Sequence, residues 1–176
     1  MYKPHTSMGH RLINHQRIGL LMNEDLERLR GIADYQFGHG AGRCLFPDSI
    51  RIEYSKNTDR PRHVFIDDVM IANYRPTDAL FTITIAGAMR LNELPGFTGY
   101  VIVVDDVLEF IEQGKNLFAK HVLEAGPGIR PDDEVIVRDT NGRVTAVGKA
   151  ILTSEEMSSF KTGLAVNVRR GRERHR

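Results

Sequence analysis

The stretch "GKNLFAKHVLEAGPGIRPDDEVIVRDTNGRVTAVGKA", from Gly114 to Ala150, decides the fold of the second half of the chain. Within it, "EVIVRD" and "RVTAVGKA" flank Asn141-Gly142, and Asn-Gly between two strand-like runs is the strongest short signal for a β-hairpin. Gly148 interrupts a strand pattern, which indicates a bulge or a close approach of another backbone. "NLFAKHV" also has the pattern of a strand. The stretch is therefore predicted to be mostly β.

The residues on either side of this stretch predict more short elements. Residues 100–104 ("YVIVV") read as a strand, and a short helix follows with Asp105 or Asp106 as its N-cap and Gly114 at its end. The remaining predictions are a capping box at Thr153 and Glu156 and a last strand at "GLAVNVRR". Many short strands and two small helices within about 70 residues favour a compact β-barrel.

The first half of the chain has a different pattern. Residues 23–35 predict an amphipathic helix, capped by Asn23, with Leu26, Leu29 and Ile32 on one face. Three strands, at 49–55, 62–67 and 69–75, follow as a small meander, and "TITIAGAMRLNEL" predicts a second helix whose start is uncertain. Pro95 to Gly99 is the best domain boundary. We expect an α+β fold with a leader at 1–22, an α+β domain at 23–98, a barrel at 99–170 and a basic tail at 171–176.

The first half also contains a glycine run, "QFGHGAGRCLF", with Gly38, Gly40 and Gly42. Such a run suggests a phosphate cradle when it joins a strand to a helix. Here it follows a predicted helix and precedes a predicted strand, so turns are the favoured interpretation.

Charge is unevenly distributed along the 176 residues, although the net charge is only +1. From Lys161 onward the chain holds six cations and one acid, so this end is locally basic. A basic end on a mildly acidic body fits an electrostatic contact with phosphates, and a solvated terminus without a partner fits it equally well.

Nothing in the sequence forms a catalytic set. Cys44 is the only cysteine, which excludes an internal disulfide and any site built from several cysteines within one chain, and it reads as an inert, partly buried thiol. His5, His10 and His15 lack metal-site spacing, and the adjacent aspartates read as turn formers and caps. There is no nucleophile elbow or Walker motif. We expect no enzyme activity, metal or cofactor.

The location of the protein is predicted from the lack of membrane-spanning and secretory signals in the sequence. No apolar run approaches the ~20 residues that span a bilayer, and no secretory leader opens the chain. We therefore expect a cytoplasmic protein without a membrane partner.

From about Tyr100 to Arg170 the chain resembles a PUA domain, the small RNA-binding barrel named after pseudouridine synthases and archaeosine transglycosylases. The resemblance lies in "IEQGKNLFAKHV", "IRPDDEVIVRD", "RVTAVGKAILTSEEM" and "KTGLAVNVRRG". "ADYQFGHGAG", "SKNTDRPRHVF" and "RPTDALFTITIAGAMRL" resemble the domain that precedes PUA in archaeosine tRNA-guanine transglycosylase and archaeosine synthase. The chain lacks the length and the cysteines of the catalytic domain of those enzymes. The resemblance therefore implies a non-catalytic tRNA-binding module that works beside a separate tRNA-modifying catalytic chain.

The resemblance also implies where RNA would bind: on the first helix of the barrel, the loop after it and the glycine-marked strand. The arginines at the end of the last predicted strand and just after it join this set because of their charge. The predicted RNA-binding residues are Gly114, Lys115, Asn116, Phe118, Lys120, Arg130, Gly148, Lys149, Arg169, Arg170 and Arg172. Each has a plainer interpretation, such as a helix C-cap for Gly114, a core side chain for Phe118 and a surface ion pair for Arg130. The alternative function is a protein-interaction module that docks a catalytic subunit, with residual RNA binding.

Overall fold

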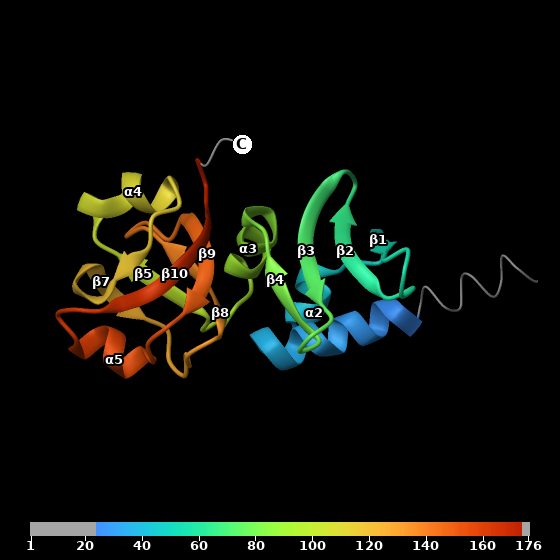
Figure 1. Ribbon diagram of the computed structural model, residues 1–176, viewed down its shortest axis with the longest axis horizontal. Coiled ribbons are helices and arrows are strands. Elements are labelled where there is room, and N and C mark those ends of the chain that lie inside the picture. Colours follow the sequence, from blue (N-terminus) through green and yellow to red (C-terminus); the bar gives the residue numbers. More distant parts are fainter. Residues whose placement is uncertain (1–23, 174–176) are drawn as a thin grey trace, which may run out of the picture.

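The computed structural model describes residues 24–173, which form an α+β domain followed by a barrel (Figure 1). The predicted leader, the Asn23 cap and residues 174–176 lie outside the described residues. The first helix runs over residues 24–37, and Leu26 and Leu29 on its predicted apolar face are buried. Gly38 and Gly40 then take positive φ angles of 100° and 89°. They lead into a short helix, α2 (Ala41–Leu45), and not into the strand that the sequence suggested.

The N-terminal domain contains a four-stranded antiparallel sheet in the order β1-β2-β3-β4. The strands are β1 (Ile50–Tyr54), β2 (Pro61–Ile66), β3 (Val69–Arg75) and β4 (Leu80–Ile83), and α3 (Ile85–Asn92) follows. The predicted three-stranded meander was one strand short, because the residues of β4 were read as the uncertain start of the helix. Thr84 marks the change, since its side chain accepts a hydrogen bond from Gly87 N and so caps α3.

The core of this domain lies between the helices and one face of the sheet. Leu29, Phe46 and Phe81 are fully buried there. The rings of Phe46 and Phe81 lie 5.1 Å apart, a tilted aromatic contact between the segment after α2 and strand β4. On the other face of the sheet, Arg51 and Glu53 of β1 are exposed and Phe65 of β2 is half-buried.

The second domain is a six-stranded sheet in the order β6-β10-β9-β8-β5-β7 that curls into a nearly closed barrel. Its elements are β5 (Tyr100–Val103), η1 (Asp105–Val107), α4 (Leu108–Glu112), β6 (Leu117–Phe118), η2 (Ala119–His121), β7 (Val122–Ala125), β8 (Glu134–Arg138), β9 (Val144–Ala150), α5 (Ser154–Ser159) and β10 (Leu164–Gly171). The β8–β9 hairpin across Asn141-Gly142 and the capping box of Thr153 and Glu156 are both confirmed.

Two local predictions in this domain are wrong. The segment "NLFAKHV" is not one strand, because the turn η2 separates β6 from β7. Neither Asp105 nor Asp106 caps the first barrel helix, since the N-cap position before η1 is Val104. Asp105 instead accepts a hydrogen bond from Thr140 Oγ1 at 3.0 Å, which ties the helix entry to the β8–β9 turn.

Strand β8 has both of its faces buried, for two different reasons. Val135 and Val137 point into the barrel and belong to its core. Ile136, on the opposite face, belongs to the core of the N-terminal domain, as do Val144 and Val147 of β9. The N-terminal domain therefore covers this outer face of the barrel, and α3 lies between the two sheets (Figure 1).

One charged group is buried in the contact between the domains. The side chain of Glu134, on the outer face of β8, is only 4% exposed. Its Oε1 accepts a hydrogen bond from the backbone N of Ile83 at 2.9 Å, and its Oε2 accepts one from Arg169 Nη1 at 2.8 Å. Arg169 Nη2 contacts Glu134 Oε1 and donates to the carbonyl of Ile83 at 2.9 Å. Glu134, Arg169 and Ile83 thus form a polar bridge that joins β8, β10 and β4.

We predict that this bridge acts as a unit. Arg169→Met leaves a buried carboxylate without its cation and should lower the free energy of unfolding by about 2 kcal/mol. Glu134→Gln keeps an acceptor for Ile83 N and leaves an arginine that water can reach. It should therefore lower the free energy of unfolding by only about 1 kcal/mol. The double variant should lose clearly less than the sum of the two, as measured by urea unfolding. Additivity within about 0.5 kcal/mol would show that the two side chains are independent.

Candidate nucleic-acid interface

The end of α4 and the loop after it occupy one end of the barrel. Gly114 ends the helix with a φ of 88°, a left-handed conformation that favours glycine. Lys115 is exposed. Asn116 Oδ1 accepts a hydrogen bond from the backbone N of Val168 at 3.0 Å, so this side chain holds the loop against β10. Of these three predicted residues, Lys115 alone has a charged group that faces solvent.

Phe118 and Lys120 lie on β6 and η2, beside the start of β10, where Phe118 pairs with Leu164. Phe118 was expected to be a core residue more readily than a stacking surface, but the residue is 47% exposed. An exposed aromatic next to an exposed lysine can stack on a base while the ammonium group meets a phosphate. The apolar position that β6 contributes to the core is its neighbour, Leu117.

Arg130 and Lys149 lie close to the same turn before β8, but they differ in their partners. Lys149 Nζ forms an ion pair with Asp132 Oδ1 at 2.8 Å, and this hydrogen bond lowers the pKa of the Asp132 carboxyl. Arg130 is exposed, and its side chain makes no ion pair within residues 24–173. Arg130 is therefore the more available cation for an outside anion.

Gly148 serves the chain itself. A Cβ atom at this position would lie 2.4 Å from the carbonyl oxygen of Asn167 and 2.9 Å from Val168 Cα, both of them backbone atoms of β10. One of the two interpretations of the glycine, the close approach of another backbone, is therefore confirmed. The space beside Gly148 is filled by β10.

The arginines at the end of the chain do not form a separate tail in the described residues. Strand β10 continues to Gly171, so Arg169 and Arg170 belong to it and Arg172 follows directly. Val168 pairs with Gly148 and Arg170 with the next residue, Val147, which makes Arg169 the extra residue of a β-bulge. Neighbouring side chains of a regular strand point to opposite faces, yet Arg169 and Arg170 are both exposed. The bulge re-aims this part of the strand towards the N-terminal domain.

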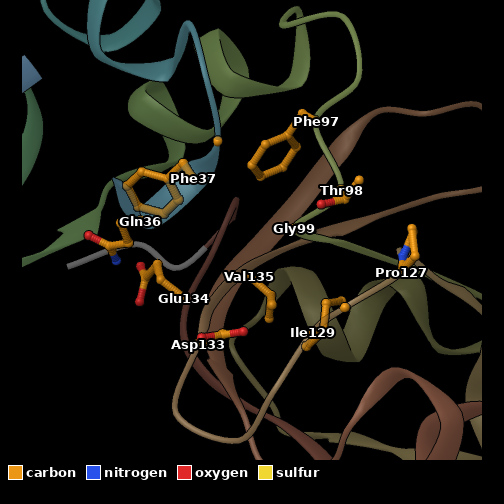
Figure 2. Close-up of a pocket in the computed structure, with 12 residues that line it drawn as sticks. Gln36, Phe37, Phe97, Thr98, Gly99, Pro127, Ile129, Asp133, Glu134 and Val135 are labelled. Atoms are coloured by element: carbon orange, nitrogen blue, oxygen red, sulfur yellow. The ribbon is translucent and has the colours of Figure 1, made fainter. Parts of the chain in front are cut away.

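Two pockets between the domains have opposite charge character. The first holds about 160 Å³ and is lined by Asp133 and Glu134 without any cation; Figure 2 shows it with the rings of Phe37 and Phe97 on one side. The second holds about 520 Å³ and is lined by Arg169, Arg170 and Arg172 without any acid. The polar bridge of Glu134, Arg169 and Ile83 links the two. Of these two pockets, the second is therefore the one that suits an anionic ligand.

The remaining chemistry is sparse among the described residues. Cys44 is partly buried and donates to the carbonyl of Arg90 at 3.0 Å, and burial raises the pKa of its thiol, as fits the predicted inert residue. Residues 24–173 contain no group of three or more His, Cys, Asp or Glu side chains placed to hold a metal ion. Over the same residues, no helix combines the length and the apolar character needed to cross a bilayer.

Some site residues gave no signal in the sequence. Glu134 reads as the start of a strand, and its burial depends on a contact with β4, which was itself missed. Asn73 and Thr82, which face the β10 arginines across the second pocket, come from the other domain. Only the pairing of two distant strands brings them together, and no local pattern reports that.

Comparison with known families matches both halves of the chain. Residues 27–96 match the patch-forming domain C2 of tRNA-guanine transglycosylase, and residues 99–172 match the PUA domain. The two matches follow each other in the order that the sequence suggested.

Similar proteins agree with this assignment. A tRNA-guanine(15) transglycosylase of Methanothermobacter thermautotrophicus is 40% identical over 149 residues, which is 84% of this chain and 23% of that protein. One of Thermococcus kodakarensis is 44% identical over 81% of this chain and 24% of its own length. The chain thus spans about a quarter of these relatives, at their C-terminal end. A hypothetical protein from Pyrococcus horikoshii has the same fold, with a TM-score of 0.68 at 20% identity, over 84% of this chain and 90% of that one.

We predict that Gly148 matters for folding. Gly148→Ala should cost about 1–3 kcal/mol of unfolding free energy, because the added methyl group must displace the β10 backbone. Gly31→Ala is the matched control, since Gly31 is exposed in the first helix and a Cβ there meets nothing within 4 Å. That control should stabilise by up to about 1 kcal/mol. Thermal unfolding of both variants tests this prediction. Equal melting temperatures would contradict the close contact of Gly148 with the β10 backbone.

Proposed function

The chain carries the patch-forming C2 domain of tRNA-guanine transglycosylase followed by a PUA domain, and from this pair we propose that it binds tRNA. The observation that carries the proposal is the match, at 40% identity, to the C-terminal quarter of a protein named for its action on tRNA. The tRNA would then bind to the surface of the barrel and to the groups that face the neighbouring domain.

Three cations on the barrel are suited to phosphate contacts. Lys115, Lys120 and Arg130 are exposed, and none of them forms an ion pair within residues 24–173. They lie after α4, on η2 and before β8, so they are spread around the barrel and follow no single strand. Such an arrangement reads the shape of a folded RNA through its phosphates, without reading its sequence base by base. Phe118 offers a stacking surface beside Lys120.

We further propose that the chain is an accessory, non-catalytic RNA-binding partner of a separate tRNA-modifying chain in the cytoplasm. In support, its matches cover the C2 and PUA domains of the relatives and leave about three quarters of each relative unmatched. No nucleophile and base lie together in the pockets described above. The ligand is RNA, and no cofactor is required for this role.

One observation favours the alternative, a docking surface for a catalytic subunit. Val69 and Met89 are 54% and 48% exposed, and with Ile66, Ile71 and Ala86 they form the apolar part of a groove beside α3. Asp67, Arg90 and Glu93 also line this groove. Exposed apolar side chains gathered in this way can receive an apolar segment of a partner chain. Met89→Glu should then abolish capture of a partner chain from native lysate while leaving tRNA binding intact. Unchanged capture would remove this surface from the proposal.

The tRNA proposal predicts the effect of a triple variant. Lys115→Ala/Lys120→Ala/Arg130→Ala should weaken binding to a tRNA transcript at least tenfold and lower the slope of log Kd against log salt by roughly two units. The melting temperature should not change, since exposed cations add little stability. The matched control, Arg43→Ala/Lys56→Ala/Arg60→Ala, removes the same charge from exposed positions on the other domain. Equal affinities for the two triple variants, measured by fluorescence anisotropy, would refute this interface.

A further inference from the structure

The second pocket between the domains, the arginine cleft, is built by both of them. Arg169, Arg170 and Arg172 form one wall of this cleft of about 520 Å³, and β3, β4 and the start of α3 form the other. None of its twelve lining residues is acidic. Because each domain supplies one wall, the cleft exists only while the domains keep this arrangement.

The positive charge of the cleft is not cancelled within the described residues. Arg169 is balanced by Glu134 in the polar bridge. The side chains of Arg170 and Arg172 pair with no carboxylate of residues 24–173. The Arg172 side chain makes one long contact of 3.3 Å, from Nη1 to the carbonyl of Val144. Two uncompensated guanidinium groups in a concave surface concentrate positive potential there. Their planar donor forks match the oxygen atoms of a phosphate.

The opposite wall offers neutral donors. Asn73 Oδ1 lies 2.5 Å from His63 Nδ1, which occupies the acceptor end of this amide and leaves its two N–H groups available. Thr82, the strand partner of Asn73 on β4, adds a hydroxyl group to the same wall. Arginine on one side and amide or hydroxyl groups on the other are the usual contacts to the phosphates and sugars of a nucleic acid.

The β3 wall of the cleft continues across the N-terminal sheet onto β2. Strand register places Phe65 opposite Met70 and His63 opposite Asn73, and both Met70 and Asn73 line the cleft. The guanidinium carbon of Arg51 lies 4.1 Å from the centre of the half-buried Phe65 ring. A cationic groove that continues into an aromatic surface is the pattern of single-strand binding, in which the groove follows the backbone and bases stack beside it.

We propose that the arginine cleft binds the phosphate backbone of an unpaired RNA strand, with the adjacent bases lying beside Phe65 and Arg51 on β2 and β1. The volume is that of a small-molecule site, which admits one or two nucleotides and not a double helix. The site is distinct from Lys115, Lys120 and Arg130 on the barrel. It rests on the proposed function only in that its ligand is also RNA.

The test uses fluorescein-labelled hexauridylate and the full chain. Arg170→Ala/Arg172→Ala should raise the Kd for hexauridylate at least tenfold and reduce its log–log salt slope by roughly 1.4, since each single-strand phosphate contact contributes about 0.7. Phe65→Leu keeps an apolar side chain without the aromatic ring and should raise the Kd about threefold to tenfold with an unchanged salt slope. Lys56→Ala/Arg60→Ala is the control of equal charge on exposed positions at the β1–β2 turn.

The outcomes separate this proposal from the one on tRNA. Hexauridylate binding that Arg170→Ala/Arg172→Ala weakens at least tenfold and Lys56→Ala/Arg60→Ala preserves supports the cleft, even if whole tRNA does not bind. Binding of tRNA together with no binding of hexauridylate overturns the cleft and leaves the proposed function standing. An equal loss in both double variants would also overturn it, because the effect would then be one of net charge.

Discussion

The pairing of Glu134 with Arg169 is the constraint on which the arrangement of this protein depends. A carboxylate whose side chain is 4% exposed requires a cation and hydrogen-bond donors, and here the cation comes from β10 and the donor from the backbone of Ile83 in the other domain. The apolar contacts of Ile136, Val144 and Val147 bury area between the domains but would tolerate sliding. The polar bridge adds direction, because its hydrogen bonds fit one relative position of β4, β8 and β10.

The same bridge decides how charge is distributed between the domains. Arg169 is the extra residue of the β10 bulge, and by pairing with Glu134 it leaves Arg170 and Arg172 as the unbalanced cations of the cleft. Glu134 lines the opposite pocket, where Asp133 adds a second carboxylate. One surface between the domains therefore attracts anions and the other does not.

The structural features that could be predicted from the sequence are those that local patterns of residues determine. The Asn141-Gly142 turn, the Thr153 capping box, the apolar face of the first helix and the left-handed Gly114 follow from neighbouring residues. Strand β4 was missed, since its β-branched residues run directly into a helical pattern. The bulge at Arg169 and the burial of Glu134 could not be predicted, because each depends on residues that are far apart in the chain. Of the residues predicted as a basic tail, Gly171 ends β10 and Arg172 follows it directly.

The central claim is that the two domains form one rigid unit, which gives the arginine cleft its fixed walls. Backbone ¹⁵N relaxation of the free chain tests it most directly, because a rigid unit tumbles with a single correlation time. We expect one correlation time for the amides of β1–β4 and of β5–β10, and two different correlation times after Arg169→Met. Distinct correlation times for the two domains in the unaltered chain would contradict it, since the arginine cleft would then have no fixed walls.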